Sequence, residues 1–154
     1  ECRPIPAATL EDAAATSQPA AVMVLDRLVD PHNVGAVVRS AVAAGITGFV
    51  LSDRRAAPPR GGGVQGAAGA PEPGPGGLDA AAERALWGLE LLTGPVAIVV
   101  GGEGGGLSRL VANRVDVTVS IPMFGPTESL NASVASALAA FEVARIRSVG
   151  RNGP

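Results

Sequence analysis

The chain has 154 residues, 47% of them hydrophobic, which is enough apolar material for one globular domain with its own core. Its single cysteine, Cys2, excludes an internal disulfide, and its single histidine, His32, excludes the histidine pairs and Cys/His clusters that hold zinc, so we expect no metal. The net charge of −2 argues against a broadly basic surface, so any contact with a nucleic acid must be local.

Residues 1–19 contain three prolines and no hydrophobic period, which is typical of a linker or a disordered lead-in. They lack the charged-then-apolar pattern of a signal peptide. No later run approaches the roughly 18 apolar residues that cross a bilayer. We therefore expect one domain over residues 20–150, in the cytoplasm and without a membrane partner.

The segment after this lead-in has the pattern of a strand, a helix and a second strand. The apolar run at 21–25 indicates a buried strand, and 48–52 indicates the next one. Between them, Asn33 is placed to cap a helix and Gly45 to end it. This order predicts a parallel sheet with a right-handed crossover, whose ligands bind beyond the carboxyl ends of the strands, here near residues 30–35. The apolar residues at helical spacing are Val34, Val37, Val38, Ala41 and Val42.

The middle of the chain is less regular. Residues 56–77 hold eight glycines and five prolines, which predicts a loop. We expect two short elements next, a helix at 78–84 and a strand at 86–90. The apolar run at 95–100 then predicts a buried strand.

The last third of the chain predicts three elements. A short helix follows the glycine-rich turn 101–106 and ends near Asn113, and the alternating residues 115–121 form a last strand. The clearest helix covers 130–147. Its apolar residues serve either the core or an interface between two copies of the chain; they are Val134, Leu138 and Phe141.

The glycine-rich turn lies where a backbone can approach a nucleotide-like ligand closely. It does not complete a phosphate loop, because Leu107 occupies the lysine position of that motif and the chain has no lysine. Its spacing also departs from the dinucleotide fingerprint, so a nucleotide-dependent oxidoreductase would rest on the glycines alone. Glu103, inside the turn, is a candidate acceptor for a hydroxyl or an arginine. His32 has no nucleophile elbow to support a hydrolase.

Two further clusters carry hydrogen-bonding groups. Asn33 and Arg39 lie on the first predicted helix. The alternative to a functional role is a helix cap for Asn33 and a solvated side chain for Arg39. Residues 128–133 open the final helix with more polar groups than one helix start requires. Together with backbone N–H groups, they could hold the carboxylate and amino groups of an amino-acid-like ligand.

Taken together, three segments resemble the three motifs of the SpoU (TrmH-like) RNA ribose 2'-O-methyltransferases, in order and in spacing. The stretch 25–52 is most similar to the branch that methylates a guanosine ribose in large-subunit (23S) ribosomal RNA. The segments are Asn33-x-Gly35-x-x-x-Arg39, then Gly101-x-Glu103-Gly104-x-Gly106-Leu107-Ser108, and then Ile121-Pro122-Met123-x-Gly125 leading to Ser129-Leu130-Asn131-x-Ser133.

The resemblance implies an α/β fold of the SPOUT type: a parallel sheet with helices on both faces and a C-terminal deep trefoil knot, working as a homodimer. It also implies S-adenosylmethionine as cofactor and an RNA substrate. By the same resemblance, the cofactor would lie against Gly101, Ile121, Met123, Gly125 and Leu130. The catalytic and substrate-orienting residues would be Arg39, Asn33, Glu103, Ser129 and Asn131.

The implied reaction is attack of a ribose 2'-hydroxyl on a sulfonium methyl group, which needs alignment and removal of one proton but no metal. We expect Arg39 to grip the target phosphate and stabilise the developing alkoxide, because a guanidinium holds its proton too tightly to act as a base. Two alternatives stay open. One is a methyltransferase for another rRNA or tRNA site, and the other is a non-catalytic RNA-binding or ribosome-assembly factor on the same fold.

The sequence departs from the family pattern in three places. Gly102 stands where the second motif usually has asparagine or a small residue. The segment 54–94 is shorter than the family's usual run through a helix and an additional strand, which leaves the number of strands open. We also expect the N-terminal RNA-binding domain that is common in this branch to be absent, with its linker at residues 1–19.

Overall fold

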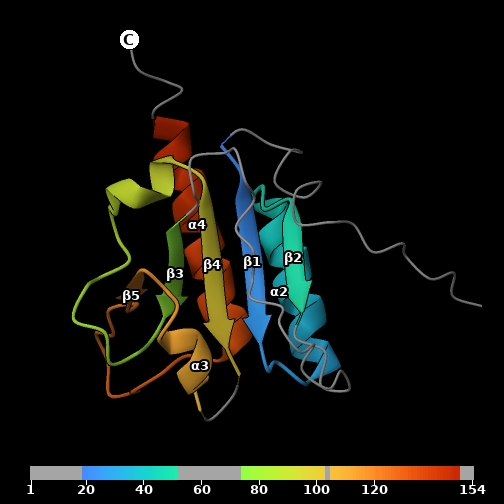
Figure 1. Ribbon diagram of the computed structural model, residues 1–154, viewed down its shortest axis with the longest axis vertical. Helices are drawn as coiled ribbons and strands as arrows, with labels where there is room; N and C mark the ends of the chain where they lie inside the picture. The colour runs from blue at the N-terminus through green and yellow to red at the C-terminus, as the bar shows by residue number, and fades with distance from the viewer. Residues whose placement is uncertain (1–18, 52–73, 103–104, 150–154) are drawn as a thin grey trace, which may run out of the picture.

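Five parallel strands form one sheet in the computed structural model, which describes residues 19–51, 74–102 and 105–149 (Figure 1). The strand order is β2-β1-β4-β3-β5, and every neighbouring pair is parallel. The strands are β1 (Ala21–Asp26), β2 (Gly48–Leu51), β3 (Gly74–Leu78), β4 (Val96–Gly101) and β5 (Val117–Val119). The parallel sheet predicted from the strand-helix-strand pattern is confirmed.

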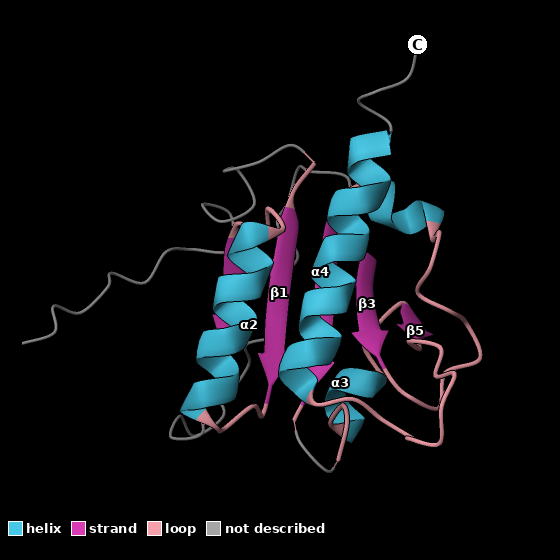
Figure 2. Cartoon of the chain, turned by 180° about the vertical axis from the view of Figure 1, so that it is seen from behind, coloured by secondary structure: helices cyan, strands magenta, loops and turns pink. Residues whose placement is uncertain are grey.

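The two long helices, α2 (Pro31–Ala43) and α4 (Ala132–Val149), lie side by side on one face of the sheet (Figure 2). Alternate residues of β1 and β4 point toward them, because Met23 and Ile98 are register partners and both belong to the buried core. The helices contribute small or branched residues to that core, such as Val37 of α2 and Ala139 of α4. This packing buries the strand residues that face α2 and α4. It does not cover the carboxyl ends of the strands, where the loops begin.

The short helix α3 (Arg109–Ala112) belongs to the opposite face. A side chain on Gly77 would point away from α2 and α4, because Gly77 pairs with Val99 rather than with a core-facing residue of β4. A Cβ there would lie 2.6 Å from Leu107 Cδ1 and 3.3 Å from both methyl groups of Val115, the residues that flank α3. Helices therefore cover both faces, as predicted. The trefoil knot stays a prediction.

The strand β3 corrects the prediction of a loop over 56–77. Its sequence, Gly-Pro-Gly-Gly-Leu, is the least suited to a strand by residue preference, yet Gly74–Leu78 is paired with β4 on one side and β5 on the other. Backbone pairing on both edges stabilises this strand, although its side chains do not favour one. The additional strand that residues 54–94 left in question is thus present, while residues 56–73 lie outside the described part of the chain.

The next two predictions, a helix at 78–84 and a strand at 86–90, are wrong. Asp79 starts a turn in which its carboxylate accepts the Ala81 N–H at 2.9 Å. The chain then forms a 3-10 helix, η1 (Glu90–Thr93). The apolar side chains of this stretch recur every third residue rather than every second, which suits a tight turn against the core and not a strand. They are Leu86, Leu89 and Leu92, all buried.

Several element ends are close to those predicted. α2 stops at Ala43 and Gly45 follows with a φ of +89°, which confirms glycine as the end of this helix. α3 ends at Ala112 with Asn113 as its C-cap, which agrees with the expected end near Asn113. The predicted strand at 115–121 is shorter, and the final helix begins and ends two residues later than 130–147. Ser52 and residues 1–18 of the predicted lead-in lie outside the described ranges.

Arg147, in the last turn of α4, fastens the amino-terminal ends of the two central strands. Its guanidinium donates to the backbone oxygens of Pro19 and Ala20, just before β1, at 2.8 and 3.0 Å. It also donates to the oxygens of Leu92 and Gly94, before β4, at 3.1 and 2.6 Å. A planar group with five donors suits this arrangement. The described helices include none long and apolar enough to cross a membrane.

The apolar residues that were candidates for either core or interface lie on the outer side of α4. Val134, Leu138 and Phe141 are 47%, 38% and 52% exposed, whereas Ala139, Ala140 and Val143 face the sheet. The core alternative is therefore wrong for these three residues. Phe141 is also flanked by Glu142, which is buried, because Glu142 turns inward to accept the Gly88 N–H at 2.7 Å.

Candidate functional site

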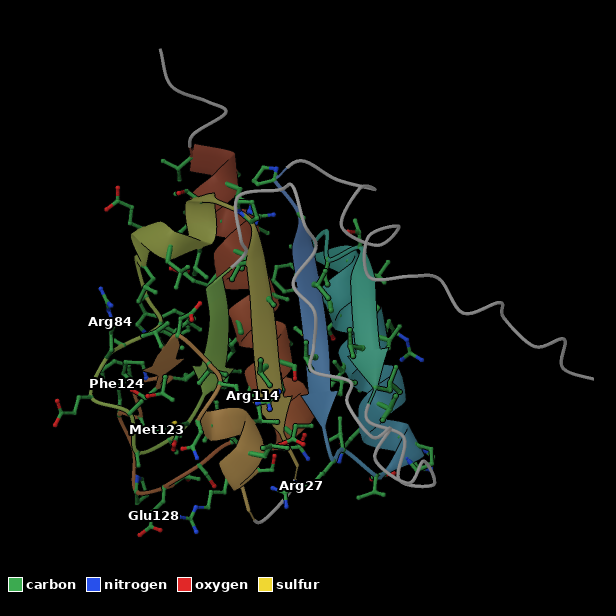
Figure 3. All side chains as sticks on the ribbon, in the orientation of Figure 1. Arg27, Arg84, Arg114, Met123, Phe124 and Glu128 are labelled. Atoms are coloured by element: carbon green, nitrogen blue, oxygen red, sulfur yellow. The ribbon has the colours of Figure 1, made fainter. Side chains whose placement is uncertain are left out.

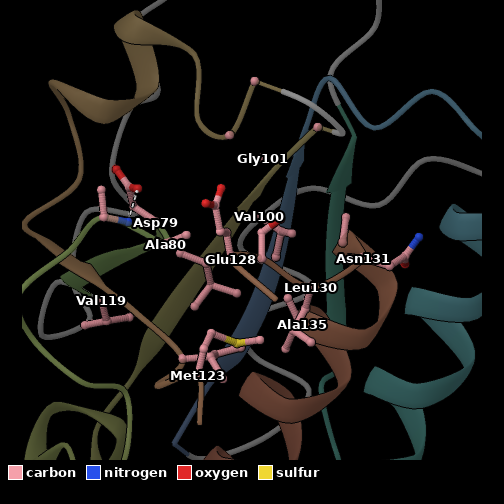
Figure 4. A pocket seen from close by; sticks show the side chains of 18 residues that line it. Asp79, Ala80, Val100, Gly101, Val119, Met123, Glu128, Leu130, Asn131 and Ala135 are labelled. Carbon is pink, nitrogen blue, oxygen red and sulfur yellow. Dashed lines mark hydrogen bonds between the residues drawn. The ribbon is translucent and has the colours of Figure 1, made fainter. Parts of the chain in front are cut away.

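A cavity of about 710 Å³ opens at the carboxyl edge of the sheet (Figure 4). Three segments that are distant in sequence line it: residues 78–81 after β3, the glycine-rich turn after β4, and the loop from β5 into α4. Ligands of open parallel sheets bind at this edge, because the loops that follow neighbouring strands converge there. The position and size of the cavity mark it as the candidate site.

The glycine turn gives the cavity a wall of bare backbone. A Cβ on Gly101 would lie 2.1 Å from the carbonyl carbon of Gly106, and a Cβ on Gly102 would lie 2.5 Å from the backbone oxygen of Arg27. Gly106 has a φ of +58°, which favours glycine. The turn therefore folds back on itself and against the end of β1 in a shape that larger residues exclude.

The charged side chains that line the cavity within the described residues are both carboxylates. Asp79 follows β3 and Glu128 precedes α4, and both are exposed at the cavity in Figure 4. Carboxylates accept hydrogen bonds from hydroxyl and ammonium groups and repel phosphates. The described lining thus suits a ligand with hydroxyls or positive charge, and it offers no arginine to a phosphate.

Four of the five residues expected to hold a cofactor line this cavity. Gly101 comes from the end of β4, Ile121 and Met123 come from the loop after β5, and Leu130 comes from the segment before α4. Gly125 is not among the lining residues. It lies in the exposed part of the loop beyond Phe124, which is 95% exposed and is labelled with Met123 in Figure 3.

The expected catalytic residues are only partly brought together. Ser129 and Asn131 line the cavity, and the Asn131 amide donates to the side-chain oxygen of Asn33 at 3.4 Å. Arg39 is exposed on α2 and is not in the cavity lining of its own chain. Glu103 lies outside the described residues.

The helix cap predicted at Asn33 is wrong. The cap of α2 is Asp30, whose carboxylate accepts the His32 N–H at 2.9 Å, and Pro31 occupies the first helical position. Asn33 lies inside the first turn instead. Its side chain meets Asn131 at the start of α4, which joins the first of the three sequence segments to the third.

The sequence motifs do not reveal the contribution of residues 78–81 to the cavity. Asp79 carries the signal that could have revealed it, since it is a carboxylate directly after a strand of the sheet. That strand was hidden by its glycines and proline. Glu128 was noticed as part of a polar helix start, and the structure places it in the cavity lining. Among the described residues, no three acidic, histidine or cysteine side chains gather as a metal site requires.

Comparison with protein families matches residues 78–141 to the SpoU rRNA Methylase family. A protein of Mycolicibacterium gilvum (strain PYR-GCK), described as an uncharacterized tRNA/rRNA methyltransferase, is 42% identical over 159 aligned positions, which cover 90% of this chain and 50% of that protein. This chain therefore spans about half the length of the curated relatives that it matches.

Solved structures agree in fold. The SpoU methyltransferase AviRb from Streptomyces viridochromogenes superposes with a TM-score of 0.78 at 27% identity, covering 97% of this chain and 67% of that one. Its complex with the cofactor AdoMet gives 0.74 at 25% identity, with 94% and 63% covered. A structure described as an RNA 2'-O ribose methyltransferase gives 0.66 at 29% identity, with 86% and 58% covered. In its sheet, its motifs and these relatives, the chain is similar to the SpoU methylase family, whose model matches residues 78–141.

Proposed function

We propose that this chain transfers a methyl group from S-adenosylmethionine to a ribose 2'-hydroxyl of RNA, with a guanosine of large-subunit (23S) ribosomal RNA as the target and the cytoplasm as the place of action. The observation that carries the proposal is the cavity in which the glycine turn meets the loop after β5, the second and third SpoU-like segments. AviRb, with a TM-score of 0.74, has been solved with AdoMet, and a neighbour at 29% identity is described as a ribose 2'-O-methyltransferase.

The residues of the cavity fit this cofactor. About 710 Å³ lies within the range of roughly 300–1,000 Å³ that small-molecule sites occupy. The bare backbone of Gly101 and Gly102 permits close approach, and apolar side chains such as Ile121 and Leu130 can cover an adenine. Asp79 and Glu128 can accept bonds from ribose hydroxyls or from an ammonium group. When bound, the cofactor supplies an electrophilic methyl group on a positively charged sulfur.

The polar residues beside the cavity would orient the ribose. Ser129 and Asn131 line the cavity, and Asn33 is bonded to Asn131, so these three form one polar edge. Arg39 would hold the target phosphate and stabilise the alkoxide that develops as the 2'-oxygen attacks. Arg39 does not act as the base that takes the hydroxyl proton, because its guanidinium is already protonated. Glu103 and Ser129 would orient Arg39 or relay that proton.

A homodimer would complete this site. Arg39 is exposed outside the cavity of its own chain, and α4 presents Val134, Leu138 and Phe141 to solvent beside α2. Pairing of two such apolar faces would bury them and could carry Arg39 of one subunit toward the cavity of the other. We therefore propose that the active form is a dimer.

Calorimetric titration of the purified chain with S-adenosylmethionine tests the pocket without needing the RNA, and NAD is the control. We expect saturable binding near one cofactor per subunit and none for NAD. Transfer of labelled methyl groups to ribosomal RNA, followed by mapping of the modified nucleotide, then tests the substrate. Arg39→Ala should abolish transfer and leave the cofactor Kd within about twofold, and loss of both would contradict the role of Arg39. A folded dimer that binds no cofactor would favour a non-catalytic RNA-binding factor.

A further inference from the structure

Asp26, the last residue of β1, reaches across the carboxyl edge of the sheet to the end of the glycine turn. Its carboxylate oxygen Oδ2 accepts the Ser108 N–H at 2.6 Å, and the side chain is buried, with Asp26 only 6% exposed. Asp26 is not part of the cavity lining. Burial of a carboxylate is costly unless its partners are well placed, so this contact is a built feature rather than a surface encounter.

Arg27, the next residue, holds the same turn at a second point. Its Nη2 donates to the Gly106 oxygen at 3.3 Å, and its Nε lies 3.7 Å from Asp26 Oδ1. Figure 3 shows Arg27 at the carboxyl end of β1, beside α3. Among the described residues, Arg27 is the non-glycine residue with a positive φ, +59°. A side chain in that conformation is strained, and here the strained residue is the one that contacts the turn.

These contacts grip the turn at both of its ends. The beginning of the turn is packed on β1, since the Cβ position of Gly102 lies 2.5 Å from the Arg27 oxygen. The end of the turn is bonded to β1 through Gly106 and Ser108. The described glycines of the turn, Gly101, Gly102, Gly105 and Gly106, all line the cavity. A loop held in its binding shape before the ligand arrives binds more tightly, because less ordering occurs on binding.

We propose that Asp26 is a positioning residue that holds the glycine turn in the shape that binds S-adenosylmethionine, with Arg27 as a weaker second contact. The proposal rests on the proposed function. Asp26 touches neither cofactor nor substrate; it acts through the Ser108 N–H. The bond of Arg27 is longer and its side chain is about half exposed, so its share is smaller than that of the buried Asp26 contact.

The test compares cofactor affinity with folding in the full chain. Asp26→Ala removes the acceptor, and Asp26→Asn keeps an oxygen for the Ser108 N–H while removing the charge. Arg27→Gly removes the guanidinium and suits the positive φ, so it does not strain the fold. Asp116→Ala, at an exposed aspartate outside the cavity lining, is the matched control for loss of one negative charge. Each variant is measured by calorimetry with S-adenosylmethionine and by thermal unfolding without it.

We expect Asp26→Ala to raise the cofactor Kd about tenfold or more, Asp26→Asn to fall between it and the unmodified chain, and Arg27→Gly to raise the Kd less than Asp26→Ala. Asp116→Ala should leave the Kd unchanged. Amide hydrogen exchange at Ser108, measured without cofactor, should quicken in Asp26→Ala more than exchange in β4 does. This rescue by asparagine and this local opening would not follow from a general loss of stability.

Two outcomes would overturn the proposal. A folded Asp26→Ala variant whose Kd lies within about twofold of the unmodified chain would show that the contact does not position the turn. If Asp26→Ala does not fold, Ser108→Pro removes the same bond from the donor side at a φ of −64° that proline adopts, and unchanged affinity there would be equally decisive. If the unmodified chain itself fails to bind the cofactor, the proposed function fails, and the role of Asp26 fails with it.

Discussion

The side-chain amide of Asn131 donates to the side-chain oxygen of Asn33 at 3.4 Å, which joins the start of α4 to the first turn of α2. The other end of the Asn131 amide is also engaged, because its Oδ1 accepts the Ser133 N–H at 2.8 Å and the Ser133 hydroxyl at 2.6 Å. Asn131 therefore caps α4 and faces the first motif at the same time. Its oxygen is turned to the helix and its NH₂ group to Asn33, so its two roles can be separated by substitution.

Asn131→Asp should keep the cap and lose the bridge. Aspartate still accepts from Ser133, but it places an acceptor opposite the Asn33 oxygen, so methyl transfer should fall at least tenfold with thermal stability nearly unchanged. Asn131→Ala should lose both, with about 1–2 kcal/mol of the unfolding free energy. Ser133→Ala is the comparison for the hydroxyl bond alone. Unchanged turnover in the aspartate variant would remove the bridge from the mechanism.

Gly101→Ala should weaken cofactor binding. The new methyl group would meet the Gly106 backbone at 2.1 Å, a distance that only displacement of the turn can relieve. We expect the Kd for S-adenosylmethionine to rise at least tenfold by calorimetry. The matched control is Gly94→Ala, where the nearest atom is 3.9 Å away and the φ of −88° suits alanine. Equal affinity in the two variants would argue against the turn as part of the cavity wall.

Stability should fall in acid through Glu142. Its pKa lies below the ordinary value of 4.5, because Arg145 binds both carboxylate oxygens at 2.7 Å and the Gly88 N–H adds a third bond, which together outweigh the effect of burial. A lowered folded-state pKa contributes stability that is complete above about pH 4.5 and is lost as the pH falls through the lower value. Urea unfolding between pH 3 and 6 measures this contribution. Glu142→Gln should flatten the acid slope, and an identical slope in that variant would assign the effect to other carboxylates.

Self-association should depend on the outer face of α4. Phe141→Glu places a charge beside the exposed apolar residues Val134 and Leu138 and should shift the chain toward monomer, by at least tenfold in the dissociation constant measured by sedimentation. Val149→Glu, at an exposed apolar residue near the end of the helix, is the control and should leave association unchanged. A dimer insensitive to Phe141→Glu would place the interface elsewhere.

The elements that could be predicted from the sequence are those in which apolar side chains recur at a regular spacing, because one face of the element is buried in the core. β1, β4 and α2 were predicted because runs such as Val96–Val100 and the spacing of Val37 and Ala41 are set by the core that they enter. β3 could not be predicted, since its residues lack side chains that mark a strand and it depends on pairing with β4 and β5. Because β3 could not be predicted, Asp79 could not be recognised as a residue that follows a strand.

The site residues that could be predicted are those that belong to a motif of the family. The residues whose role depends on a contact between distant segments of the chain could not be predicted. Ser129 and Asn131 line the cavity as expected, but Asp26 and Glu142 read in the sequence as ordinary charged residues. Their burial follows from partners 82 and 54 positions away, Ser108 and Gly88. Hydrophobic period carries no information about such distant partners, so only the folded chain reveals them.

The bonds of Arg147 have a consequence at the opposite end of the molecule. One guanidinium ties the starts of β1 and β4 together, so these neighbouring strands are prevented from sliding past each other. The amino-terminal edge of the sheet is thus held by a side chain of α4, and the carboxyl edge is held separately, where Asp26 and Arg27 bind the glycine turn.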